Sequence, residues 1–284
     1  MAHWTLDDIP WDSFDPSRID PELVPVIKAA ALTEHNSGHY SKYLCNVFRD
    51  DPVFCDQAET WAEEETRHGA ALGRWAELAD PTFDFATTFD RFAREYVIDT
   101  EVAGSIRGSR SGEMVARCIV ETGTSSFYSA LRDATDEPVL KAICHRIAGD
   151  EFRHFKLFYS TLKRYLEREN LSRRRRLLVA LSRMQESEDD ELAFAYHCAN
   201  TPDRPYSRAA SGRAYAARAF RHYRIGHIDR SSAMVMKAAG LSPHGRVGRL
   251  FAGALWRYLR FRLWRLEGEV PAATNDGGGR SQAA

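Results

Sequence analysis

Apolar residues recur at helical spacing along most of the chain. From Pro21 onward they fall at Leu23, Val26, Ile27 and Ala30, which are the three- and four-residue steps of one helix face. We find no alternating run of apolar and polar residues, flanked by turn residues, that would predict a strand. The pattern therefore predicts an all-α protein. In the first 170 residues we expect helices over 21–48, 53–79, 84–105, 113–134 and 138–168.

The pattern is weaker after residue 170. A loop is expected over 201–213, and helices over 213–224, 229–239 and 245–267. We divide the chain into four segments on this basis. They are an N-terminal arm (1–20), a helical bundle (21–170), a basic helical extension (171–270) and a disordered tail (271–284).

The composition is that of a soluble globular protein, with 44% hydrophobic and 28% charged residues among 284. This excludes collagen, a wholly disordered chain and a disulfide-stapled mini-protein. No apolar run is long enough to span a membrane, and the first residues do not resemble a signal peptide. The five cysteines are scattered, which is typical of free thiols in a reducing compartment. We therefore expect a cytoplasmic protein.

Charge is distributed unevenly along the chain. Residues 1–170 carry a net charge of −11, whereas residues 171–284 carry +10. The basic part can meet an anionic partner such as a lipid surface or an acidic protein. Alternatively, the two parts neutralise each other across an internal contact.

Two Glu-x-x-His tetrads carry the candidate chemistry. They are formed by Glu65 with His68 and by Glu151 with His154. Residues three apart on a helix lie on one face, about 5–6 Å apart at Cβ, so that a carboxylate and an imidazole can bind one metal ion together. Each tetrad follows a further glutamate on the preceding predicted helix.

These further glutamates are Glu34 and Glu121, and a predicted turn lies midway between each of them and its tetrad. Two antiparallel helices joined by a tight turn bring residues equidistant from the turn to the same height. Glu34 should therefore face the first tetrad and Glu121 the second. The alternative is that all these side chains are surface charges on amphipathic helices.

The arrangement occurs twice, which indicates a duplicated helical hairpin. Four carboxylates and two imidazoles from four helices form the ligand set of carboxylate-bridged dimetal bundles. A long connection between the two hairpins is typical of the ferritin-like fold. Mixed oxygen and nitrogen donors favour two iron ions, or a mixed iron–manganese centre. We expect a ferritin-like antiparallel four-helix bundle with a long crossover.

Four short segments resemble the metal-binding motifs of the soluble acyl-[acyl-carrier-protein] desaturases, which belong to the ferritin-like superfamily. The segments are Thr33-Glu34, Trp61–Gly69, Glu121–Thr124 and Asp150–His154, and the resemblance covers roughly residues 30–160. One departure is His35, which follows Glu34 where the family has an acid. The resemblance implies iron binding by six residues, Glu34, Glu65, His68, Glu121, Glu151 and His154.

The resemblance also implies roles for individual residues. Glu65 and Glu151 would bridge the two ions, and Thr124 would lie beside the face of the centre where oxygen binds. Among the neighbouring residues, we expect Asp150 to hydrogen-bond His68 and Glu64 to hydrogen-bond His154, because a metal-bound histidine usually donates its second N–H to an acid. Trp61, one turn before Glu65, should point toward the site, as core packing or as an electron route.

The activity implied is that of a diiron oxidoreductase that activates dioxygen and acts on a fatty acyl chain. The substrate would be held by an acyl carrier protein. Electrons would come from a ferredoxin or a reductase, because the chain has no flavin or iron–sulfur motif. Three alternatives stay open. They are a hydroxylase or N-oxygenase of a small metabolite, a ferroxidase or iron-binding protein, and a degenerate bundle kept for binding.

Two further features bear on the partners and the pocket. Small residues follow Glu121 at positions 122–126, and they are expected to leave room near the metals. The helix predicted over 245–267 interleaves arginines with large apolar residues. It can lie on a membrane surface, dock an acidic acyl carrier protein, or pack within the protein or across a homodimer. No nucleic-acid partner is expected, because no recognised motif is present.

Overall fold

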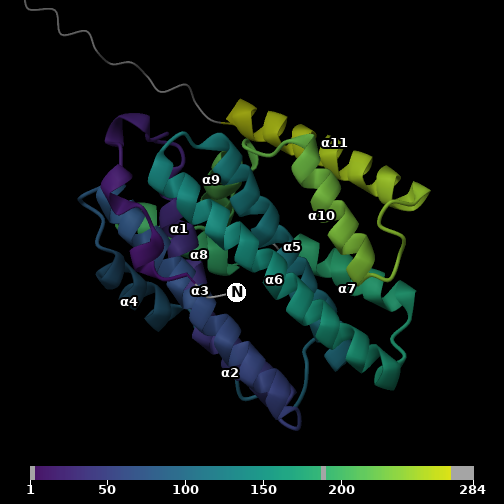
Figure 1. Ribbon diagram of the computed structural model, residues 1–284. Coiled ribbons are helices and arrows are strands. Elements are labelled where there is room, and N and C mark those ends of the chain that lie inside the picture. The colour runs from purple at the N-terminus through teal and green to yellow at the C-terminus, as the bar shows by residue number, and fades with distance from the viewer. Residues whose placement is uncertain (1–3, 187–189, 270–284) are drawn as a thin grey trace, which may run out of the picture.

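The computed structural model describes residues 4–186 and 190–269 (Figure 1). It is built from helices and loops, with no strand among the described residues, which confirms the all-α prediction. Three short 3₁₀ turns, Leu6–Asp8, Trp11–Ser13 and Pro16–Arg18, precede the α-helices. The α-helices are α1 (Val24–His35), α2 (Ser37–Val47), α3 (Pro52–Ala79), α4 (Phe85–Glu95), α5 (Arg110–Ala134), α6 (Pro138–Glu169), α7 (Arg173–Gln185), α8 (Asp190–Asn200), α9 (Arg208–Phe220), α10 (Ile225–Ala238) and α11 (Arg246–Glu269).

The four arms of the bundle are formed by five helices, because α1 and α2 together make one arm. α1 and α2 together pack along α3, α5 packs along α6, and α3 contacts α6 to join the two hairpins. Residues 80–109, including α4, form the long connection between the two hairpins that was predicted. Asp51 and Glu137 cap the N-termini of α3 and α6 with their side chains, and each precedes a proline at the first helical position.

Two of the predicted helices are wrong in extent. The helix predicted over 21–48 is broken at Asn36, where three residues of low helix propensity, Asn36-Ser37-Gly38, follow one another. The helix predicted over 84–105 ends at Glu95. Residues beyond it lie across α2, held by hydrogen bonds from Asn46 Nδ2 to the carbonyl of Thr100 (2.7 Å) and from Arg49 Nη2 to that of Ala103 (3.0 Å).

The extension also differs from expectation. α7 and α8 were not predicted, and α9 begins at Arg208, inside the loop expected over 201–213, because Ser207 caps its N-terminus. The residues of α8 and α9 that face the bundle share one apolar core with α1, namely Ala195, Tyr196, Ala199, Tyr215 and Ala219. α10 packs on α5 and α7, and α11 packs on α9 and α10. The tail predicted over 271–284 lies outside the described residues.

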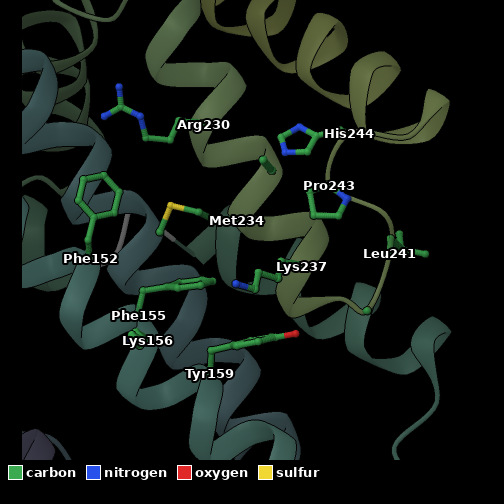
Figure 2. Close-up of a pocket in the computed structure, with 12 residues that line it drawn as sticks. Phe152, Phe155, Lys156, Tyr159, Arg230, Met234, Lys237, Leu241, Pro243 and His244 are labelled. Atoms are coloured by element: carbon green, nitrogen blue, oxygen red, sulfur yellow. The ribbon is translucent and has the colours of Figure 1, made fainter.

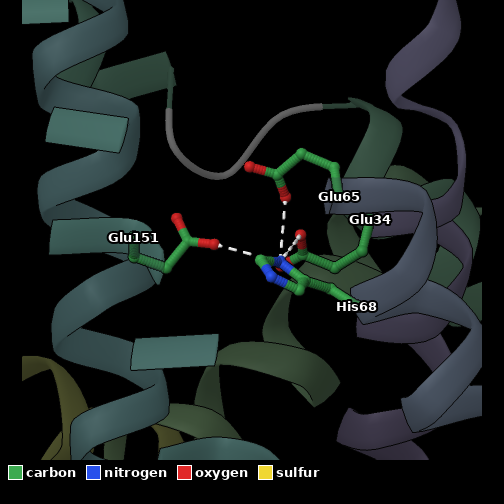
Figure 3. Close-up of side chains that lie close together, drawn as sticks. All are labelled: Glu34, Glu65, His68 and Glu151. Atoms are coloured by element: carbon green, nitrogen blue, oxygen red, sulfur yellow. Dashed lines mark ion pairs between the residues drawn. The ribbon is translucent and has the colours of Figure 1, made fainter. Parts of the chain in front are cut away.

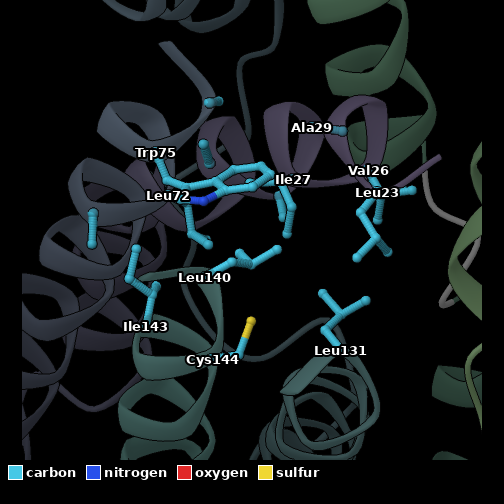
Figure 4. Close-up of a cluster of buried hydrophobic side chains, with 14 of the residues drawn as sticks. Leu23, Val26, Ile27, Ala29, Leu72, Trp75, Leu131, Leu140, Ile143 and Cys144 are labelled. Carbon is cyan, nitrogen blue, oxygen red and sulfur yellow. The ribbon is translucent and has the colours of Figure 1, made fainter. Parts of the chain in front are cut away.

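Two apolar cores lie at opposite ends of the bundle. One contains Leu72 and Trp75 of α3 with Leu140 and Ile143 of α6 (Figure 4). The other contains earlier residues of α3 and later residues of α6, such as Phe54 and Phe158. Along each of these antiparallel helices a short polar stretch separates the two cores. The candidate site is formed by these stretches.

No helix in the described part of the chain combines the length and the apolarity needed to cross a membrane.

Candidate metal centre

The six residues predicted as metal ligands come together in the middle of the bundle. Their side chains are buried, with exposed fractions between 0 and 8%. We call them the carboxylate–histidine cluster. One comes from α1, one from α5, two from α3 and two from α6, in the order Glu34, Glu121, Glu65, His68, Glu151 and His154.

The cluster consists of two overlapping groups that could each hold a metal ion. The first contains Glu34, Glu65, His68 and Glu151, and the second contains Glu65, Glu121, Glu151 and His154. In each group one ligand atom from every residue lies within 4.8 Å of the others. Glu65 and Glu151 belong to both groups. Figure 3 shows the first, with three carboxylates from different helices turned toward His68.

The Nδ1 atoms of the two histidines face the carboxylates. His68 Nδ1 lies 3.4 Å from Glu65 Oε2, 3.4 Å from Glu151 Oε1 and 3.8 Å from Glu34 Oε2. His154 Nδ1 lies 3.0 Å from Glu65 Oε1 and 3.5 Å from Glu121 Oε2. The two halves are thus related by a pseudo-twofold arrangement, which follows from the repeated hairpin.

The Nε2 atom of each histidine, on the side of the ring away from the centre, pairs with an acid on the opposite hairpin. His68 Nε2 lies 3.0 Å from Asp150 Oδ2, and His154 Nε2 lies 2.6 Å from Glu64 Oε2. The structure therefore brings together both pairs proposed from the sequence. A proton on Nε2 shared with the acid leaves the lone pair of Nδ1 directed at the centre. Arg153 lies between the two acids, with Nη1 2.5 Å from Asp150 Oδ1 and Nη2 3.7 Å from Glu64 Oε2.

The polar atoms at the centre fit a divalent metal. Nδ1 of both histidines, both carboxylate oxygens of Glu121 and Oε1 of Glu151 are buried, and none has a hydrogen-bond partner among the described residues. Buried polar groups are rarely left without a partner. Four carboxylates would also neutralise two divalent ions. Oxygen and imidazole donors together suit iron and manganese.

The electrostatics of the cluster follow from burial and from crowded carboxylates. Burial, reinforced by the charge of Glu65, raises the pKa of Glu34 to about 8 and that of Glu151 to about 7. Burial likewise raises the pKa of Glu121 well above its usual range. The pKa of Glu65 is instead well below normal, because its interactions with Glu34 and with the two histidines outweigh the effect of burial. The raised pKa values of Glu34 and Glu151 favour protons on these two carboxyl groups, which reduces the negative charge of the buried cluster.

Trp4 is a neighbour of the cluster that the sequence did not predict. Its Nε1–H donates to Asp150 Oδ2 at 2.7 Å, and its ring stacks on the His68 ring at a centroid distance of 5.9 Å. Trp4 thus links the N-terminal arm to the acid that holds His68. No local pattern indicates this contact, because Trp4 is 146 residues away from Asp150 in sequence.

Two hydroxyl groups of α5 contact the carboxylates. The Tyr128 hydroxyl donates to Glu34 Oε1 at 2.5 Å, and the Thr124 hydroxyl donates to Glu151 Oε2. Gly123 lies exposed with nothing within 4 Å of an added Cβ, so the expectation that it leaves room near the metals is wrong.

The remaining predicted neighbour, Trp61, lies against the edge of the His154 ring at a centroid distance of 6.5 Å. Trp61, Glu64 and His154 line a surface hollow of about 300 Å³ between α3 and α6. His35 lies outside the two groups, because its Nδ1 pairs with the carbonyl of Thr66 at 3.0 Å and its ring packs against Phe89.

The fold and the cluster together define an all-α bundle with a buried carboxylate- and histidine-rich centre. The model of the fatty acid desaturase family matches residues 17–187, which is more than half of the chain. The chain therefore belongs to the fatty acid desaturase family, which supports a desaturase-like oxidoreductase. The matched segment contains all six cluster residues but neither Trp4 nor most of the extension. No curated protein matches the chain.

Proposed function

We propose that the chain is a dioxygen-dependent diiron oxidoreductase that introduces a double bond into a fatty acyl chain. The observation that carries this proposal is the pair of overlapping four-residue groups that share Glu65 and Glu151. This arrangement suits two metal ions that lie side by side and share two carboxylates. Membership in the fatty acid desaturase family supports the reaction type.

The proposed assignment follows the two groups. Glu34 and His68 would hold one ion, Glu121 and His154 would hold the other, and Glu65 and Glu151 would bridge them. Two iron ions, or iron with manganese, would supply the means to reduce dioxygen, with two electrons from an external donor and two from the substrate, and so the oxidising power that an unactivated C–H bond requires.

The protein's own residues would prepare the site for this chemistry. The two apolar cores at either end of the cluster exclude water from it. Asp150 and Glu64 fix the rings of His68 and His154, so that little reorganisation is needed. The hydroxyl of Thr124, which donates a hydrogen bond to Glu151 Oε2, is the proposed proton donor or acceptor next to the centre.

A hollow on the outer face of α6 supports an acyl carrier protein as the source of the substrate. It has a volume of about 790 Å³ and lies between α6, α10 and the loop that follows α10 (Figure 2). Phe152 and Phe155, which adjoin Glu151 and His154 in the sequence, form part of its apolar lining. Its cationic lining suits an acidic carrier with a phosphate-bearing arm, and consists of Lys156, Arg230 and Lys237.

Metal content tests the centre first. We expect about two iron ions per chain after anaerobic loading, measured by plasma mass spectrometry, and loss of iron in Glu65→Ala and Glu151→Ala. Glu63→Ala is the matched control, because Glu63 lies exposed on the same helix, and it should retain the metal. A wild-type chain that binds no metal under these conditions would overturn the proposal.

Product analysis then tests the reaction. The loaded protein is supplied with acyl carrier protein thioesters, dioxygen and a ferredoxin–reductase pair, which the chain needs because it carries no redox cofactor motif of its own. We expect a product lacking two hydrogen atoms. Gain of one oxygen atom would indicate a hydroxylase instead. Oxidation of iron without any organic product would indicate a ferroxidase.

A further inference from the structure

The outward face of α11 is unusually apolar. The opposite face of this helix packs on α9 and α10 through residues such as Ala252, Leu259 and Leu266. Five large apolar side chains nevertheless point to solvent. They are Val247 (62% exposed), Leu250 (74%), Tyr258 (57%), Phe261 (52%) and Trp264 (68%).

These five residues form one stripe, because their spacing in steps of three and four, or multiples of these, places them on the same side of the helix. At 1.5 Å per residue the stripe is about 25 Å long. Figure 1 shows α11 at the edge of the molecule, outside α10. A surface helix usually has one apolar face, so a second one indicates a partner.

The charge of α11 defines what that partner is. Residues 246–266 include six arginines and no acidic residue. Arg246, Arg249, Arg257 and Arg260 are exposed, and none of them forms an ion pair with a described residue. The outward face is therefore both apolar and cationic.

We propose that α11 binds the surface of a membrane that contains anionic lipids. Arginines along an apolar, aromatic-rich face match the mixture of anionic headgroups and acyl chains at a bilayer surface. Trp264 and Tyr258 have the amphipathic side chains that favour this interface. The proposal is independent of the reaction proposed for the metal centre.

Two other occupants fit the face less well. A second copy of the chain in a twofold contact would bring arginines against arginines, with no acid on residues 246–266 to compensate. Residues 270–284 offer a single large apolar side chain, Val270, against a stripe of five.

Co-sedimentation of the full chain with vesicles tests the proposal. Vesicles of phosphatidylcholine alone are compared with vesicles containing about one third phosphatidylglycerol. We expect binding to the anionic vesicles that weakens as salt is added. The triple variant Leu250→Ser, Phe261→Ser, Trp264→Ser should reduce partitioning about tenfold or more, because it removes most of the buried apolar area. The double variant Arg257→Gln, Arg260→Gln should reduce binding to the anionic vesicles and leave binding to the phosphatidylcholine vesicles unchanged.

The matched control is Leu178→Ser with Ile106→Ser, two exposed apolar residues away from α11 (65% and 72% exposed). This variant should bind as the wild type does. All substituted side chains are exposed, and circular dichroism checks that each variant folds. Absence of binding to anionic vesicles would overturn the proposal, as would binding that the triple variant retains. A dimer of the wild type that the triple variant abolishes, measured by light scattering without lipid, would assign the stripe to a second copy.

Discussion

Gly69, which follows His68 directly, determines how closely α1 approaches α3. A Cβ added there would lie 2.5 Å from the backbone N of His35 and 2.8 Å from the carbonyl of Ala31. Both atoms belong to the backbone of α1, so a side chain would push that helix away. Because Glu34 is adjacent to His35, the absence of a side chain at Gly69 keeps Glu34 within reach of His68.

We therefore expect Gly69→Ala to lower the free energy of unfolding by about 1–3 kcal/mol and to weaken metal binding. Gly123→Ala should raise it by about 0.5–1 kcal/mol, because Gly123 is exposed within α5 and an added Cβ meets nothing. Urea unfolding of the two variants beside the wild type gives both values. Changes of the same sign in both would contradict this account.

The six residues of the carboxylate–histidine cluster could be predicted because each depends only on helix periodicity and on the position of a turn. Glu34 and Glu65, for example, are placed by the turn before α3. Contacts of Trp4 and Tyr128 could not be predicted in the same way. They depend on how the N-terminal arm and α5 dock in three dimensions, which no local pattern records.

Among the helices, α1 and α3 are also joined by an ion pair at one end. Lys28 Nζ lies 2.5 Å from Asp80 Oδ2, and Lys28 is buried, whereas Asp80 is about one third exposed. The hydrogen bond from Lys28, helped by Thr82, lowers the pKa of Asp80 to about 2. A carboxyl whose pKa is lowered in the folded state stabilises the protein at pH values above the pKa that this carboxyl has in the unfolded chain. This stabilisation is lost as the pH falls from about 4 toward about 2.

We expect the free energy of unfolding of Lys28→Met to fall by about 1 kcal/mol less than that of the wild type between pH about 4 and about 2, after allowance for the exposure of Asp80. The measurement is the urea midpoint of the metal-free protein at several pH values between about 5 and 2.5. Lys141→Met is the matched control, since its partner Asp136 is 3.9 Å away and both side chains are exposed. An equally steep acid dependence in wild type and Lys28→Met would show that the pair contributes nothing.

Tertiary contacts act beside the local signals at Asn36–Gly38 and Ser207 in the helices that were mispredicted. The side chain of Asn36 donates to Glu191 Oε1 at 3.1 Å, so α8 holds the break between α1 and α2 in place. Glu186 pairs with Arg107, and Glu191 accepts hydrogen bonds from Asn36 and Tyr40. Hydrophobic periodicity therefore predicted the bundle helices apart from the break at Asn36, and it missed α7 and α8.

At the scale of the whole molecule, the extension completes the bundle. α8 and α9 contribute to the same apolar core as α1, and Arg218 of α9 pairs with Glu22 at 3.2 Å. Acidic and basic parts of the chain thus meet in part across internal contacts. The outward face of α11 is the basic surface that these contacts leave exposed.

The buried cluster couples metal binding to the stability of this whole assembly. Without metal, four carboxylates and two imidazoles share a dry centre, where burial raises the pKa values of Glu34 and Glu151. A metal that binds the folded state alone stabilises it by about 2.7 kcal/mol at a concentration of about 100 times Kd. For a chain of 284 residues this corresponds to a rise in Tm of about 4–5 °C.

Differential scanning fluorimetry under anaerobic conditions, with ferrous iron or manganese, measures this rise, and a chelator should reverse it. Glu151→Ala should abolish the rise, because Glu151 belongs to both four-residue groups. Trp4→Phe should reduce it, since Asp150 then loses the indole N–H that helps to hold it against His68. Glu63→Ala should match the wild type. A metal-induced rise that survives in Glu151→Ala would place the binding ion elsewhere in the protein.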